Sequence, residues 1–353
     1  MTTPGGQDGR LTVVLPTYRH GQYIRAALDS LIAQTRKPDR LLIIDDASED
    51  DTAAIIAGYA ERYPWFEIVT NPDNRGVVAC LNAGIADSDS EYVTFLASDD
   101  FILPTLYEKT LQLLDAHPVA GLCAVLTRWV DETGRPVRQP RPVSLGREAR
   151  YIAPDEIAQA LMRHGSIFGG NGTVYRTSEL REAGDFDPNL GAFCDGYAIQ
   201  LLSLRHGACY VPEILAAWRR SSGSYAVATQ TDPHACRAIL DAIMHRIWQT
   251  DEAVFPVAYR RRLERRLRFT LAAAVVGADP ADGDSLREAL GGSWQWLYPI
   301  LRTTRRLVGR SATSLLLLGA LRPWDLLPAS ARHLFAWPAG AATFNPFKET
   351  LMR

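Results

Sequence analysis

The stretch Leu41-Leu42-Ile43-Ile44-Asp45-Asp46-Ala47-Ser48 contains a pair of aspartates, and Tyr92-Val93-Thr94-Phe95-Leu96-Ala97-Ser98-Asp99-Asp100 ends in a second pair. Each pair follows an apolar run that is typical of a buried strand in a parallel sheet. In an open α/β sheet, ligands bind beyond the carboxyl ends of the strands. Four carboxylates there would repel one another unless a cation, such as a divalent metal carrying a diphosphate, lay among them. The alternative is that aspartates only begin turns and cap helices, which is our interpretation of Asp50 and Asp51.

Strand and helix signals alternate on both sides of these stretches. Strands are predicted at 11–15, 40–44, 66–70 and 92–96, and helices at 23–33, 48–60, 76–85 and 106–116, with Ser48 as the N-cap of the second helix. This alternation indicates βαβ units with right-handed crossovers. Further on, strands are predicted at 120–130, 173–175 and 209–211, and helices at 154–164 and 198–204. The glycine patterns of Rossmann and P-loop proteins are absent, which disfavours a dinucleotide-dependent dehydrogenase.

The composition is that of an ordinary globular protein, with 353 residues, 47% hydrophobic and 22% charged. The formal net charge of −2 gives no global argument for nucleic-acid binding. Five scattered cysteines form no C-x-x-C pair, which favours a reducing compartment over a disulfide framework or zinc site. The seven histidines lack metal-ligand spacing. Neither a signal peptide nor an apolar stretch of membrane-spanning length is recognised, so we expect a cytoplasmic protein.

Taken in order, the motifs resemble those of the family 2 glycosyltransferases, which are inverting enzymes with the GT-A fold. The resemblance covers roughly residues 10–225. Its segments are Val14-Leu15-Pro16-Thr17-Tyr18, Ile43-Ile44-Asp45-Asp46-Ala47-Ser48, Asn74-Arg75-Gly76, Leu81-Asn82-Ala83-Gly84-Ile85, Tyr92–Pro104, and Gly184-Asp185-Phe186-Asp187 leading to Asp195 and Arg205-His206-Gly207. One such segment alone would be weak support, whereas six in the family's order are specific.

The resemblance implies a fold and a domain plan. The fold class is α/β, of the GT-A type: a Rossmann-like, mostly parallel sheet flanked by helices, with a C-terminal helical extension. We expect a flexible N-terminus at 1–9 and a glycosyltransferase domain at 10–230. That domain would comprise a nucleotide-binding half at 10–115 and an acceptor-binding half at 116–230, and a helical region would follow at 231–353.

The resemblance also implies roles for single residues. Asp100 is expected to bind Mg²⁺ or Mn²⁺, and Asp99 to hold the ribose or assist with the metal. Asp46 would accept the N3–H of uracil, which favours a UDP-sugar. Asp195 would be the catalytic base for single displacement with inversion; the alternative is an N-cap of the following helix. The other expected nucleotide contacts are Pro16, Thr17, Tyr18, Asn74, Arg75 and Ser98, with a structural turn as an equal alternative for Asn74 and Arg75.

The chain departs from the family pattern at three places. Ala97 replaces an aspartate of many members, Asp195-Gly196 replaces Glu-Asp, and Ser221 stands where many have a histidine that reaches the metal. With fewer protein ligands, diphosphate and water must complete the metal shell. Arg219 and Arg220 are therefore candidate phosphate contacts, which would weaken metal dependence. The alternative for both arginines is a solvated loop.

The region after residue 232 lies outside the resemblance. One predicted helix carries a cluster of arginines, and tryptophans follow it: Arg260, Arg261, Arg262, Arg265, Arg266 and Arg268, then Trp294, Trp296, Trp324 and Trp337. This pattern indicates an interfacial helix on an anionic membrane. The slightly favoured alternative is a helical appendage packed on the catalytic domain. A nucleic-acid role lacks a companion motif.

The leading hypothesis is an inverting glycosyltransferase that moves a sugar from a nucleotide-sugar, expected to be a UDP-sugar, to a hydroxyl. The acceptor would be a polysaccharide, a lipid-linked glycan or a glycoprotein. The protein would act in the cytoplasm or peripherally at the inner face of the cytoplasmic membrane. One alternative is a catalytically weak sugar-nucleotide-binding or assembly subunit. Another, a nucleotidyltransferase, is disfavoured because segment 16–21 is not a Gly-rich, Lys/Arg-containing loop.

Overall fold

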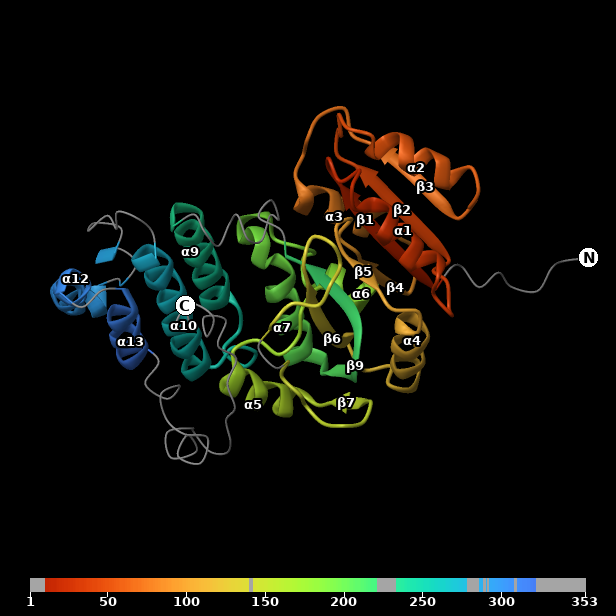
Figure 1. The fold of residues 1–353 in the computed structure, drawn as a ribbon. Helices are drawn as coiled ribbons and strands as arrows, with labels where there is room; N and C mark the ends of the chain where they lie inside the picture. Colours follow the sequence, from red (N-terminus) through yellow and green to blue (C-terminus); the bar gives the residue numbers. More distant parts are fainter. Residues whose placement is uncertain are drawn as a thin grey trace, which may run out of the picture. The chain divides into compact units, whose positions relative to one another are not determined.

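The computed structural model describes residues 10–139, 142–220, 233–277, 286–287, 290, 292–307 and 310–321. The chain divides into two compact units (Figure 1). The first comprises Met1–Ile157 and Phe168–Arg220, and the second comprises Ala158–Ile167 and Ser221–Arg353. Each unit is described below by itself.

The first unit is built on a mixed nine-stranded sheet. The strand order is β3-β2-β1-β4-β8-β6-β9-β5, and β7 pairs with β9. The strands are β1 (Leu11–Thr17), β2 (Arg40–Asp45), β3 (Phe66–Thr70), β4 (Tyr92–Phe95), β5 (Phe101–Ile102), β6 (Leu122–Val130), β7 (Arg150–Ile152), β8 (Val174–Arg176) and β9 (Ala208–Arg219). Strands β1 to β4 are parallel to one another, whereas β8 runs antiparallel between β4 and β6. The predicted α/β class is confirmed.

Helices cover this sheet in the expected alternation. They are α1 (Ile24–Ile32), α2 (Thr52–Ala60), α3 (Val77–Asp87), α4 (Leu106–Ala116), α6 (Thr177–Glu182), the 3₁₀ segment η1 (Pro188–Phe193) and α7 (Cys194–His206), while α5 (Pro154–His164) begins in this unit. All seven residues of β1 are buried, as the continuous apolar run predicted. Helix α3 approaches β1 so closely that a Cβ on Gly84 would lie 2.4 Å from the Val14 side chain.

Several element boundaries differ from the sequence prediction. Ser48 was expected to cap α2, but this is wrong: the helix begins at Thr52, with Asp51 at the N-cap. The Ser48 hydroxyl instead accepts a hydrogen bond from the Arg19 backbone N–H at 2.9 Å. Strand β9 and helix α7 are longer than predicted, and β5, β7 and α6 were missed because segments of two to six residues carry little periodicity.

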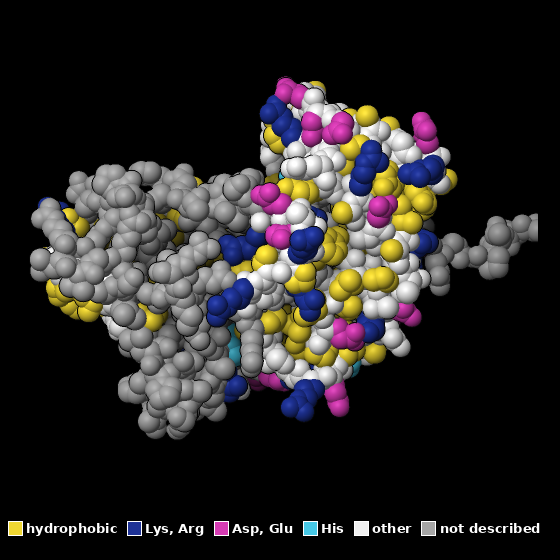
Figure 2. Space-filling model, viewed as in Figure 1, with side chains coloured by type: hydrophobic (Ala, Val, Ile, Leu, Met, Phe, Trp, Pro, Cys, Tyr) yellow, Lys and Arg dark blue, Asp and Glu magenta, His cyan; other side chains and the backbone are white. Residues whose placement is uncertain are grey.

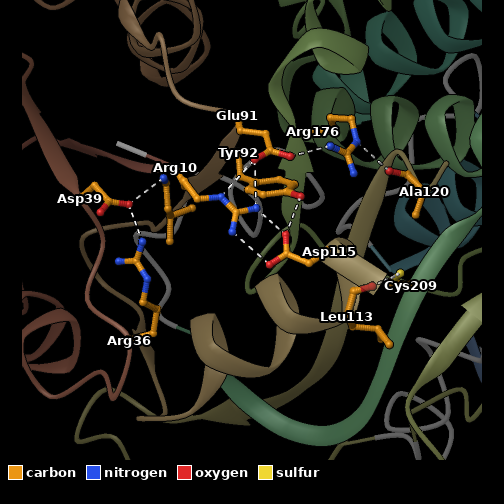
Figure 3. Close-up of polar contacts among 11 residues, drawn as sticks. Arg10, Arg36, Asp39, Glu91, Tyr92, Leu113, Asp115, Ala120, Arg176 and Cys209 are labelled. Carbon is orange, nitrogen blue, oxygen red and sulfur yellow. Dashed lines mark hydrogen bonds and ion pairs between the residues drawn. The ribbon is translucent and has the colours of Figure 1, made fainter. Parts of the chain in front are cut away.

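A polar network joins the amino ends of β1 and β4 (Figure 3). Arg10 forms hydrogen-bonded ion pairs with Glu91 (3.0 Å) and Asp115 (3.0 Å). Arg176 binds the other oxygen of Glu91 at 3.0 Å. Both guanidinium groups lie over the Tyr92 ring, at 5.5 and 5.1 Å from its centroid. The network therefore connects β1, β4, β8 and α4 at the edge of the sheet opposite to the acidic pairs.

The second unit is helical. Its elements are α9 (Pro233–Gln249), α10 (Val257–Gly277), the 3₁₀ segment η2 (Gly292–Leu297), α12 (Tyr298–Leu307) and α13 (Arg310–Leu321), together with the end of α5. Its core includes Leu240, Phe269, Leu301 and Leu317. Among the residues described, no helix combines the length and apolarity needed to cross a membrane.

Two arginines of the predicted basic cluster are buried inside this unit. Arg266 donates to the carbonyls of Leu161, Met162 and Arg163 at 2.9–3.2 Å and so satisfies the end of α5. Arg260 donates to three carbonyls between residues 248 and 255. Arg261 and Arg265 are exposed. Of the tryptophans that follow, Trp296 is 59% exposed, whereas Trp324 and Trp337 and the side chain of Trp294 lie outside the described part.

Candidate active site at the carboxyl ends of the strands

The two acidic pairs lie at the same edge of the first unit's sheet. Strands β2 and β4 both pair in parallel with β1, so Asp45-Asp46 and Asp99-Asp100 follow strands separated by a single strand. All four aspartates are at most 9% exposed. Burying four carboxylates is unfavourable unless hydrogen bonds or cations compensate for the lost hydration, so the partners of each one identify its role.

The Asp46 carboxylate holds the segment that leads into α3. It accepts hydrogen bonds from the Asn71 side chain (2.7 Å) and from the backbone N–H groups of Arg75 (2.9 Å) and Gly76 (2.8 Å). Burial raises the pKa of Asp46, but these three donors outweigh it and hold the pKa below its usual value. The sequence analysis did not predict a role for Asn71. The feature that could have indicated one is its position directly after a strand. The proposed contact of Asp46 with uracil stays a prediction.

The residues after β1 present both a hydroxyl and a ring. Thr17 is 3% exposed, and its hydroxyl has no hydrogen-bond partner among the described residues. Tyr18 is 38% exposed, with the Arg19 guanidinium 5.1 Å from its ring centroid. Ser98, predicted to contact the nucleotide, lies with its hydroxyl 2.6 Å from Nδ1 of His20. His20 had no assigned role in the sequence analysis because its partner lies 78 residues away.

The remaining predicted nucleotide contacts differ in accessibility. Pro16 is buried in β1, in register with Ile44. Asn74 and Arg75 are exposed, and the backbone N–H of Arg75 donates to Asp46. Their side chains thus remain accessible at the edge where the acidic pairs lie.

Asp100 is the most deeply enclosed of the predicted ligands. Its Oδ1 accepts the backbone N–H of Arg219 (2.6 Å), and its Oδ2 accepts the side-chain N–H of Asn171 (3.1 Å). Burial, and then the charge of Asp99, raise the pKa of Asp100 well above its ordinary value, against the opposing effect of Arg219. Two adjacent buried carboxylates are therefore incompletely neutralised by the described residues.

This environment fits a divalent cation. Hard cations prefer carboxylate oxygens, and an uncompensated carboxylate pair is the donor set that such an ion would neutralise. No cluster of three or more His, Cys, Asp or Glu side chains suited to a metal occurs among the described residues. Asp99 and Asp100 would hold the ion, and diphosphate and water would supply the other ligands.

Arg219 and Arg220, the two candidate phosphate contacts, have different environments. Arg219 is 4% exposed and donates to the carbonyls of Asp99 (2.6 Å), Asp131 (3.1 Å) and Glu132 (2.6 Å). Its guanidinium therefore braces the backbone around the acidic pair.

Among the residues that the structure describes, Arg220 has no such set of acceptors. Its guanidinium lies 4.5 Å from the ring centroid of Trp129 and 5.7 Å from that of Trp218. Its Nε is buried without a hydrogen-bond partner in the described structure. The two candidates are thus distinguished by structure: Arg219 is engaged by the protein, whereas Arg220 retains unsatisfied donor capacity.

Asp195 lies inside the first turn of α7, whose N-cap is Phe193, so the alternative interpretation of Asp195 as the N-cap is wrong. Its Oδ1 accepts the backbone N–H of Gly196 at 2.6 Å. Its Oδ2 packs against Gly170, where an added Cβ would be 1.8 Å away. Burial raises the pKa of Asp195, although backbone N–H groups oppose the shift. A carboxylate with a raised pKa, half-buried at a helix start, has the properties of a general base.

The comparisons with known proteins agree with this architecture. The family described as "Glycosyl transferase family 2" matches residues 12–183. An uncharacterized glycosyltransferase of Escherichia coli (strain K12), YibD, is 36% identical over 113 residues, which span 31% of this chain and 33% of that relative. The uncharacterized protein Rv1520 of Mycobacterium tuberculosis is 30% identical over 249 residues, 66% of this chain and 68% of that relative.

Two solved structures share the fold. Residues 1–349 of S. aureus TarS in complex with UDP-GlcNAc align with a TM-score of 0.60 at 17% identity, covering 90% of this chain and 91% of that one. The mannosyltransferase PcManGT from Pyrobaculum calidifontis, in complex with GDP-Man and Mn²⁺, aligns with a TM-score of 0.55 at 17% identity, covering 90% and 88%. At such identities the likeness concerns the fold alone. The family match, the relatives and the placement of the acidic pairs together lead to one conclusion: this chain belongs to glycosyl transferase family 2.

Proposed function

We propose that the first unit transfers a sugar from a nucleoside-diphosphate sugar to an acceptor hydroxyl by single displacement with inversion. One observation carries the proposal. The carboxylate of Asp100, beside Asp99, is buried, and that of Asp195 is half-buried. The two contact adjacent residues of one short segment, Asn171 and Gly170. The contacts of Asp100 and Asp195 with neighbouring residues, at the carboxyl edge of the sheet where ligands of α/β folds bind, support a cation role for the first and a base role for the second.

The chemistry follows from these roles. Asp195 takes the proton from the acceptor hydroxyl as its oxygen bonds to the anomeric carbon. The bond between that carbon and the diphosphate breaks, and its electron pair leaves with the diphosphate. Mg²⁺ or Mn²⁺ held by Asp99 and Asp100 would stabilise the charge on the leaving group. Arg220, with its unsatisfied donor, is our candidate for a direct phosphate contact.

We propose a uridine nucleotide as the donor. The unpartnered hydroxyl of Thr17, the exposed ring of Tyr18 and the carboxylate of Asp46 together provide a hydrogen-bonding group, a stacking surface and an acceptor for a base N–H. The solved structures with this fold contain UDP-GlcNAc in one case and GDP-Man in another, so guanosine is the competing base.

The acceptor and the place of action are proposals as well. We infer a hydroxyl of a polysaccharide, a lipid-linked glycan or a glycoprotein, used in the cytoplasm or at the inner face of the cytoplasmic membrane. The exposed Arg261 and Arg265 of α10 support a peripheral contact with anionic lipid, whereas the buried Arg260 and Arg266 do not contribute to one.

Ligand-induced stabilisation tests the donor proposal. The shift in melting temperature follows RT ln(1 + [L]/Kd), so UDP, GDP, CDP and ADP with and without Mn²⁺ can be ranked without an acceptor. We expect the largest shift with UDP and Mn²⁺, and loss of the Mn²⁺-dependent part in Asp100→Ala. Equal Mn²⁺ responses in the wild type and this variant would remove Asp100 from the metal site. UDP binding without any sugar transfer would favour a non-catalytic subunit of a glycan-synthesis complex.

A further inference from the structure

The segment Gly169–Gly172 contacts the carboxylates of Asp100 and Asp195, and hydrogen bonds from two threonine hydroxyls hold its backbone. The hydroxyl of Thr173 donates to the Gly169 carbonyl at 2.7 Å, and the hydroxyl of Thr127 donates to the Asn171 carbonyl at 3.2 Å. Gly172 has φ +81°, and a Cβ there would lie 2.8 Å from the Ala216 and Val125 side chains. From the sequence, the glycines around Asn171 predict either a flexible loop that contacts the acceptor or, at least equally, a simple connection between strands.

The hydrogen bonds of Asn171 determine which way its amide points. Its Nδ2 lies 3.1 Å from the Asp100 carboxylate and 2.8 Å from the Ala217 carbonyl. When Asp100 is ionised, its carboxylate and the Ala217 carbonyl are acceptors that cannot donate a hydrogen bond. The amide nitrogen of Asn171 must therefore face them. Rotating the amide would place its oxygen against two acceptors. Asn171 therefore orients the Asp100 carboxylate from the side opposite to the Arg219 backbone.

The other atom of this amide is unused by the protein. The Asn171 Oδ1 is buried and has no hydrogen-bond partner among the described residues. A buried amide oxygen without a partner destabilises the protein, and such an atom beside a candidate cation site is suited to a ligand hydroxyl or a metal-bound water.

Resting on the function proposed above, we propose that Asn171 is a positioning residue for Asp100, and that segment Gly169–Gly172 sets the geometry between the cation carboxylates and the base. Asn171 fixes Asp100 through its amide. Gly170 limits where Asp195 can lie, because no side chain fits between them. A displacement of this segment would move both carboxylates relative to the bound sugar nucleotide.

The test for Asn171 is calorimetry of UDP binding with and without Mn²⁺ in Asn171→Ala. Residues that orient metal ligands typically change metal affinity 10–100-fold, so we expect the Mn²⁺-dependent part of UDP affinity to fall roughly tenfold or more. Asn82→Ala is the matched control, since Asn82 also makes two side-chain hydrogen bonds, both to the Phe186 backbone. Thermal melting shows that each variant is folded.

A double-mutant cycle separates positioning from general damage. If Asn171 acts through Asp100, Asn171→Ala causes no further loss when Asp100 is already alanine. Additive losses, or a normal Mn²⁺ response in Asn171→Ala while Asp100→Ala abolishes it, would overturn the inference and leave the proposed function intact. A normal Mn²⁺ response in Asp100→Ala itself would remove the metal role and this inference together.

The segment's effect on the base has a separate readout. Gly170→Ala forces Asp195 to move, so we expect kcat to fall at least tenfold while UDP affinity stays within about twofold, since only the base is displaced. Gly58→Ala is the control, because a Cβ at Gly58 meets nothing within 4 Å. Unchanged kcat in a folded Gly170→Ala would show that the segment does not set the position of Asp195.

Discussion

The environment of Asp195 allows its proposed role as the catalytic base to be tested directly. We expect Asp195→Asn to keep UDP affinity and to lower kcat roughly 10²–10⁴-fold, because the amide is nearly isosteric but cannot accept the proton. Since burial raises the pKa of Asp195, the acidic limb of the kcat profile should lie above about pH 4, the usual range of aspartate. Transfer rates from pH 4 to 9 measure both effects. A near-normal kcat in the variant would leave Asp195 as part of the helix start only.

Asp46 is expected to stabilise the fold as well as the site. Its replacement by alanine leaves three donors without their acceptor, so the free energy of unfolding should fall by about 1–3 kcal/mol. The folded-state pKa lies below the unfolded value, so this contribution is present above the unfolded pKa near 4 and is lost as the pH falls through the folded pKa. Urea unfolding at pH 7 and pH 3 checks this, with the exposed Asp73→Ala as control. Equal losses in both variants at pH 7 would contradict the assignment.

At the scale of elements, we expect a change in the Arg10 network to lower the stability of the first unit without affecting nucleotide binding. Arg10→Met removes the ion pairs to Glu91 and Asp115, which join β1 to β4 and α4. These groups are one-third to one-half exposed, so screening limits the expected loss in unfolding free energy to roughly 1–2 kcal/mol. The hydrogen bond from Arg10 holds the pKa of Asp115 below its usual value, so this stabilisation is present above the unfolded pKa and fades as the pH falls.

UDP binding should be unaffected, because the network lies at the amino ends of the strands and the acidic pairs at their carboxyl ends. Urea unfolding at low and high salt, together with calorimetry, checks both statements. A loss of UDP affinity in folded Arg10→Met would show that the two edges of the sheet are coupled.

For the whole molecule, the proposed membrane contact has to rest on exposed arginines. On the described surface visible in Figure 2, Lys/Arg side chains are interspersed with Asp/Glu side chains, so this face carries no uniformly basic patch. We expect sedimentation with anionic vesicles at low salt, at about 1 kcal/mol per arginine near the surface, and its loss in Arg261→Glu with Arg265→Glu. Arg25→Glu with Arg62→Glu makes the same charge change in the first unit. The proposal would be contradicted if both double variants sedimented equally with the vesicles, or if the wild-type protein did not sediment with them.

Local patterns in the sequence determined the parallel half of the sheet, the two acidic pairs at its carboxyl edge and the family. Such features depend on neighbouring residues: an apolar run makes a buried strand, and helical spacing makes the helix that returns the chain. The helix at 106–116 and the strand at 66–70 were therefore predicted with their observed bounds.

Only the tertiary structure decided which distant groups meet. The contact between Asn171 and Asp100 spans 71 residues, and that between His20 and Ser98 spans 78. Likewise, the sequence could not show that the Arg219 guanidinium would donate its hydrogen bonds to backbone carbonyls, or that Arg266 would be buried at the end of α5. A side chain's role depends on the partners that folding brings to it, and no periodicity within the chain encodes those partners.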